Sequence, residues 1–102
     1  MQIQINPGDI ETSPAIDEHI ENAVEHAMRH TKDRVTRVEV HLHDENGPKH
    51  GPDKRCTMEA RIAGKDPIAV HHDAPDLYAA IDGAAGKLER AVTHKLERTA
   101  QH

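Results

Sequence analysis

The chain has 102 residues, which fits one domain spanning residues 1–102 and leaves no room for a second. Its 13 Lys and Arg against 18 Asp and Glu give a formal net charge of −5, unlike the basic composition of most nucleic-acid-binding domains. One cysteine excludes an intrachain disulfide and is consistent with the cytoplasm. The N-terminal segment lacks a basic start and a long apolar run, so we expect neither a signal peptide nor a membrane span.

The first half of the sequence predicts a strand, a helix and a second strand. Apolar and polar residues alternate over residues 1–6 and again over 37–43, which is typical of half-buried strands. Between them, Ser13 can cap a helix whose first turn accommodates Pro14. An apolar stripe at helical spacing follows, formed by Ile16, Ile20, Ala23, Val24, Ala27 and Met28.

The second half predicts a loop over 44–53, a third alternating strand over 55–62, and a short fourth strand that ends at His71-His72. Pro67 suits an edge position for this last strand. A final helix then starts at a cap provided by Asp73 or Asp76. Its apolar face comprises Leu77, Ile81, Ala84, Leu88, Ala91 and Val92. Gly83 and Gly86 weaken that helix by about 1 kcal/mol each, and close packing against a neighbour would explain them.

These elements predict an α+β fold of β-α-β-β-β-α order. Clean alternation in the three longer strands indicates a sheet with one solvated face and one face covered by both helices. The first two strands are parallel if they are neighbours, since a helix connects them.

Sequence motifs for catalysis are absent. There is no glycine-rich phosphate loop, no GxSxG elbow and no HExxH pair. Cys56 lies within a strand on the face predicted to be buried, which makes it a poor nucleophile. We therefore expect a binding protein that is not an enzyme and needs no cofactor.

Ten histidines are the most unusual feature of the composition. His19, His26 and His30 share one stripe of the first helix, and i, i+4 spacing can chelate a metal. A third ligand cannot be identified, so polar boundary residues are the favoured interpretation and a metal-binding protein the lesser one. Protonation of all ten would move the net charge from −5 toward +5, so we expect RNA affinity to rise between about pH 7.5 and 6.

The last helix carries a basic stripe at i, i+3, i+4 steps, formed by Lys87, Arg90, His94 and Arg98. Without aromatic platforms, such a stripe suits phosphate contacts on folded or duplex RNA better than base stacking. An ordinary solvated helix face is the alternative, and spacing alone does not decide between them. Further basic residues cluster at Arg29, Lys32, Arg34 and Arg37, and at Lys54, Arg55 and Arg61.

The run DLYAAIDGAAGKLERAV (76–92) with its continuation THKLER resembles the last helix of the ribosome hibernation-promoting factor family, also called the ribosome-associated inhibitor A, protein Y or sigma-54 modulation protein family. The opening MQIQIN, the capped first helix, RVTRVEVHL (34–42) and the element order extend the resemblance over nearly the whole chain. The block Tyr78–Asp82 followed by Lys87-Leu88 is its most specific part.

The resemblance implies a four-stranded sheet with both helices on one face, as in double-stranded-RNA-binding domains. It also implies a cytoplasmic stress factor that binds the rRNA of the small ribosomal subunit near the decoding region and inhibits translation, with no DNA or membrane partner. The matching basic positions are Lys87, Arg90, Lys95 and Arg98 on the last helix, with His94 at a typically basic place, and Arg29, Lys32, Arg34 and Arg37 near the first.

One departure from the family pattern favours an alternative. Residues 1–25 contain six acids and no Lys or Arg, so acids dominate the first helix where family members usually carry basic residues. The alternative function is a non-ribosomal protein-interaction or regulatory module that uses this acidic helix. The sequence does not indicate an oligomeric state.

Overall fold

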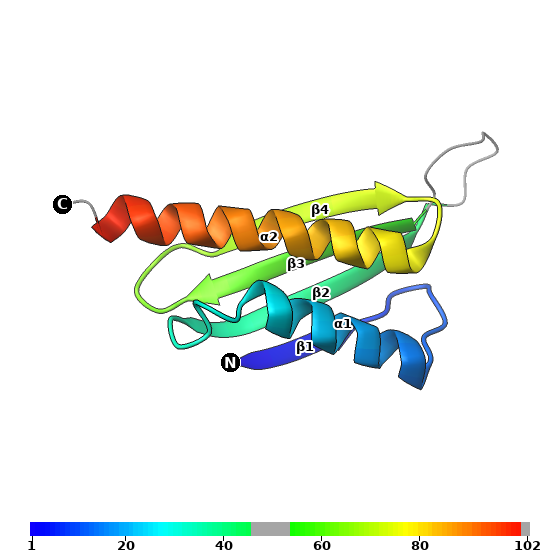
Figure 1. Ribbon diagram of the computed structural model, residues 1–102. Coiled ribbons are helices and arrows are strands. Elements are labelled where there is room, and N and C mark those ends of the chain that lie inside the picture. Colours follow the sequence, from blue (N-terminus) through cyan, green and yellow to red (C-terminus); the bar gives the residue numbers. More distant parts are fainter. Residues whose placement is uncertain (46–53, 101–102) are drawn as a thin grey trace.

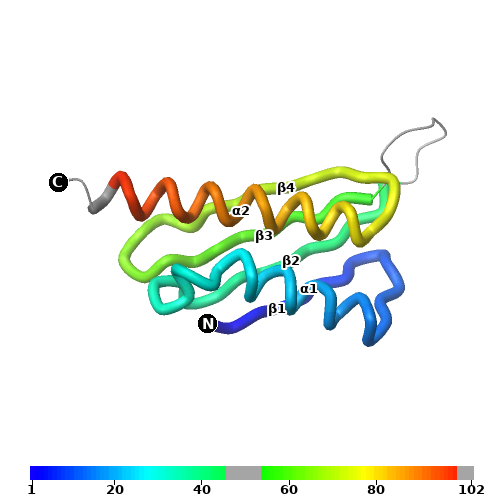
Figure 2. Tube along the Cα trace, viewed as in Figure 1, coloured from blue at the N-terminus to red at the C-terminus, as the bar shows by residue number. Residues whose placement is uncertain are grey.

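The computed structural model describes residues 1–45 and 54–100, without the side chains of 99 and 100. Its elements are β1 (Gln2–Asn6), α1 (Pro14–Ala27), β2 (Val35–Asp44), β3 (Lys54–Ile62), β4 (Ile68–Ala74) and α2 (Leu77–Ala100). Both helices cover the same face of the sheet and run in the same direction (Figures 1 and 2). The predicted element order and the two-layer architecture are confirmed.

The four strands lie in the order β1-β2-β3-β4. β1 and β2 are parallel, as predicted, and the other two pairs are antiparallel. β4 occupies the predicted edge but continues beyond His72 to Ala74, because Asp73 pairs with Arg55 and the ladder ends only at Lys54. Of the loop predicted over 44–53, Asp44 belongs to β2, and residues 46–53 lie outside the described part of the chain.

The core between sheet and helices is aliphatic. Within the described residues no polar or charged residue is buried. The largest side chains with no exposed surface are Ile20, Met28, Met58, Ile81 and Leu88, joined by Val24, Val38, Val40, Val92 and Cys56. Burial of each large aliphatic side chain contributes roughly 1.5–3 kcal/mol to stability. Without aromatic residues in the core, the packing of these aliphatic side chains stabilises the fold.

Side-chain caps start both helices. The Ser13 hydroxyl accepts a hydrogen bond from the Ile16 amide at 3.2 Å, and Pro14 occupies the first turn of α1. At α2 the Asp76 carboxylate accepts from the Ala79 amide at 2.9 Å. Asp76 is therefore the capping residue of the two candidates, and Asp73 is engaged in β4.

Gly83 brings α2 close to β4. A Cβ atom at Gly83 would overlap the imidazole ring of His72, which confirms the predicted close packing at this glycine. His72 lies on the inner side of β4, and its Nδ1 is buried without a hydrogen-bond partner. Gly86 is different, because a Cβ there would meet only the Arg90 Nη1 at 3.6 Å.

Candidate nucleic-acid interface

Ion pairs across the strands neutralise the open face of the sheet. Arg37 and Arg61 both contact the Glu39 carboxylate, at 2.8 and 3.3 Å. Burial alone raises the pKa of Glu39, but the two guanidinium groups outweigh it and hold that pKa below its ordinary value. Arg55 binds both oxygens of Asp73, at 2.7 and 3.1 Å, and this hydrogen bonding lowers the pKa of Asp73. This face therefore offers little uncompensated positive charge.

Arg37 is consequently separated from the other predicted RNA-contacting residues. It projects from the sheet on the side away from the helices, where it is half-buried beside Glu39. The sequence alone does not show this separation, because Arg37 is only three residues from Arg34. Arg34 precedes β2, whereas Arg37 lies within it, where successive side chains point to opposite faces of the sheet.

The seam between the two helices joins basic side chains of the α1 side to acids of α2. His19 Nε2 lies 2.8 Å from the Asp82 carboxylate, and the His19 ring packs edge-on against Tyr78 with centroids 4.9 Å apart. Arg29 meets the Glu89 carboxylate at 3.1 Å. His19 thus lines the groove between the helices, and the acidic flank of α2 faces α1.

The opposite flank of α2 lies over β4 and is basic. Lys87 Nζ donates to the His71 carbonyl at 3.0 Å, and Lys95 Nζ donates to the Asp66 carbonyl at 3.3 Å. The remaining basic residues of this helix are exposed: Arg90, His94 and Arg98. From Lys87 to Arg98 this flank extends about 17 Å along the helix axis. The structure therefore places all five predicted α2 residues outside the helix seam.

Three further predicted residues lie between α1 and β2. Arg29, Lys32 and Arg34 are all exposed, and the Arg34 carbonyl accepts a hydrogen bond from Ala63 at 3.2 Å. This bond holds the β3–β4 turn beside the α1–β2 connection, at the end of the domain where α2 also finishes (Figure 1). We call this region the basic end, comprising Arg29, Lys32, Arg34, Lys65, Lys95 and Arg98. Asp33, Asp66 and Glu97 are interspersed among them.

Lys65 was not among the predicted binding residues. The sequence indicated a tight turn at Gly64-Lys65-Asp66, but no linear spacing relates this turn to Lys95, 30 positions later. Only the folded β3–β4 hairpin brings the two lysines to one hollow.

The acidic residues of the first helix lie along the length of the domain. α1 begins at the end opposite the basic end (Figure 1), where Glu18 is exposed. Glu25, in the last turn of α1, is also exposed but lines a hollow together with Arg29 and Lys32 of the basic end. The acids of α1 therefore extend from the far end of the domain to the edge of the basic end. Acids on α1 need not adjoin the outer flank of α2, which points away from α1.

The thiol of Cys56 is unsuited to nucleophilic chemistry. It is fully buried, and burial raises its pKa to about 12. Among residues 1–45 and 54–100, no three His, Cys, Asp or Glu side chains converge in a way that would hold a metal ion. Over the same residues, neither helix combines the length and apolar character needed to cross a bilayer.

The fold and its basic helix flank define a class: a two-layer α+β domain with a surface suited to polyanions. The profile of the Sigma 54 modulation protein / S30EA ribosomal protein family matches residues 3–100, and the chain belongs to that family. This confirms the family resemblance found in the sequence. The search of curated proteins gave no match.

Solved structures share the fold. A ribosomal subunit interface protein from Coxiella burnetii superposes with a TM-score of 0.79 at 21% identity, covering 95% of this chain and 99% of that one. The N-terminal domain of Protein Y from Thermus thermophilus gives a TM-score of 0.74 at 25% identity, covering 92% of this chain and 98% of that one.

Proposed function

We propose that this domain binds the small ribosomal subunit through phosphates of its 16S-type rRNA near the decoding region, and that it inhibits translation while bound. In this role it acts in the cytoplasm, without catalysis and without a cofactor. The proposal joins the family membership to the charge distribution of the molecule. One solved relative is itself described as a ribosomal subunit interface protein.

The observation that carries the proposal is the exposed basic flank of α2. Arg90, His94 and Arg98 are exposed on the side of the helix that is free of α1. The open face of the sheet and the helix seam contain cations that are already matched by carboxylates. Among the described residues, no ion pair engages Arg90 or Arg98 on this flank, or Lys32 and Arg34 at the adjoining basic end, so these side chains are available to a polyanion.

Ribosome co-sedimentation tests the proposal. The triple variant Lys87→Gln/Arg90→Gln/Arg98→Gln should lower the affinity for purified small subunits and reduce the salt dependence of log K by about three units. The matched control Gln2→Glu/Gln4→Glu/Asn6→Asp makes the same change in net charge on β1, away from the helices. It should bind like wild type.

Addition to a translation extract tests the inhibitory step separately. Wild type should reduce protein synthesis in proportion to subunit occupancy, and the α2 triple variant should not. If wild type fails to sediment with small subunits even at low salt, the proposal is wrong. Capture of a specific protein partner without rRNA would instead favour an interaction module built on the acidic first helix.

A further inference from the structure

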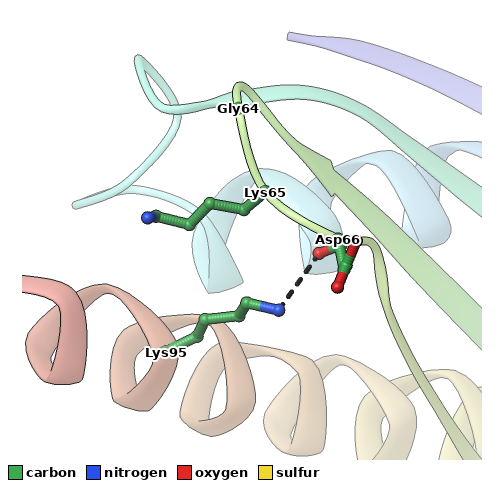
Figure 3. A pocket seen from close by; sticks show the side chains of 4 residues that line it. All are labelled: Gly64, Lys65, Asp66 and Lys95. Atoms are coloured by element: carbon green, nitrogen blue, oxygen red, sulfur yellow. Dashed lines mark hydrogen bonds between the residues drawn. The ribbon is translucent and has the colours of Figure 1, made fainter.

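A hollow of about 520 Å³ lies between the β3–β4 turn and the C-terminal half of α2, lined by Gly64, Lys65, Asp66 and Lys95. Figure 3 shows both lysine side chains in the space between turn and helix. Its volume is within the range of about 300–1,000 Å³ typical of small-ligand sites. No large apolar side chain lines it, so its chemistry suits a charged group rather than an apolar one.

The fold fixes the position of Lys65. Gly64 has a φ of +75°, which favours glycine, and the Lys65 amide donates to the Ile62 carbonyl at 3.1 Å to close the turn. The neighbouring Ala63 amide is bonded to Arg34. The turn is thus tied both to its own strand and to the α1–β2 connection, and Lys65 itself is half-buried.

Within the described residues, the ammonium group of Lys65 has no hydrogen-bond or ion-pair partner, and Asp66 does not pair with it. Lys95 differs, since its Nζ donates to the Asp66 carbonyl at 3.3 Å (Figure 3). The hollow therefore holds two cations, one of them unpaired, against the single carboxylate of Asp66.

We infer that this hollow binds one phosphate of the RNA backbone, with Lys65 as its principal contact and Lys95 as a second cation. The inference rests on the proposed function and adds a contact from the sheet side of the domain. RNA bound here would contact the β3–β4 turn as well as α2. Asp66 opposes the phosphate, so its charge limits the affinity of the site.

Two substitutions with opposite expected effects test the site. Lys65→Gln should weaken binding to small subunits by about tenfold near physiological salt and lower the salt slope by about one unit. Asp66→Asn, which leaves the turn carbonyl in place, should tighten binding several-fold. Ala79→Glu is the control, because it changes the net charge by the same amount as Lys65→Gln at an exposed position at the far end of α2.

The outcomes separate the inference from the proposed function. If wild type binds subunits and Lys65→Gln binds with the same affinity and salt slope, or Asp66→Asn gains nothing, the phosphate site is refuted while the proposed function stands. If wild type does not bind subunits, both fail. Circular dichroism of each variant checks folding, and a tighter Asp66→Asn complex cannot arise from loss of structure.

Discussion

Arg29, just after α1, is paired with Glu89 of α2 across the helix seam, with an N···O distance of 3.1 Å. The same guanidinium donates to the His26 carbonyl at 2.6 Å, so its position is fixed by two elements. A cation predicted to contact RNA is thus already matched within the domain. Any RNA phosphate must compete with Glu89 for it.

Glu89→Gln should therefore release Arg29 and tighten the complex with small subunits several-fold. The effect on stability should be small, about 0–1 kcal/mol, because the pair is partly exposed. Filter binding with labelled protein measures the affinity. Glu18→Gln makes the same charge change at an exposed position near the start of α1, at the end of the domain away from the basic end. An equal gain from both variants would mean that only net charge matters, contrary to the pairing argument.

Gly83 and Gly86 should respond oppositely to alanine. Gly83→Ala should destabilise the fold by about 1–3 kcal/mol, because the new methyl group overlaps the His72 ring and overpacking outweighs the gain in helix propensity. Gly86→Ala should stabilise it by up to about 1 kcal/mol, since only Arg90 Nη1 lies near. Urea denaturation measures both. Adding His72→Ala should relieve the Gly83→Ala defect, and a defect that persists unchanged would exclude the His72 clash as its cause.

Acid should weaken the β3–β4 pairing through Asp73. The pKa of Asp73 is held below its ordinary value of 3.8 by hydrogen bonding from Arg55. A depressed pKa in the folded state contributes stability above the unfolded value, and this is lost as pH falls through the folded value. Asp73→Asn should therefore be less stable than wild type at pH 6, with the gap closing below about pH 4. Thermal unfolding of both proteins across this pH range measures the difference in stability. A difference that does not change with pH would contradict the proposed effect of Asp73 protonation.

Base should weaken the core through Cys56. The pKa of its thiol is raised to about 12 by burial, from an ordinary value of 9.0. The unfolded chain therefore ionises first, and stability falls as pH rises from 9 toward 12. Cys56→Ala should lack this part of the decline. In native protein at pH 8 the thiol should react with a disulfide reagent far more slowly than in urea. Equal rates would show that Cys56 is accessible.

The sequence predicted most of the fold because its signals are local. Alternation in residues 37–43 and 55–62 is a property of each strand alone, and the Ser13-Pro14 cap acts within one helix turn. The end of β4 was predicted two residues early, since its extension depends on Arg55, which is distant in sequence but adjacent in the sheet.

The candidate site was less predictable, because it depends on how helices face each other. The α2 stripe could be read from its spacing, but nothing local shows that Asp82 and Glu89 face α1 while Lys87 faces β4. Arg37 and Lys65 illustrate the same limit. One is adjacent to Arg34 in sequence yet projects from the other side of the sheet, and the other lies beside Lys95 only after folding.

Tyr78 is the only aromatic residue of the chain, it is 43% exposed, and its ring rests against His19 at the helix seam. Tyrosine fluorescence of this protein therefore originates from one place, where α1 meets α2, and the aliphatic core is silent. Tyr78 is therefore an intrinsic fluorescent probe of the contact between the two helices. Separation or unfolding of the two helices can be followed there without attaching a dye.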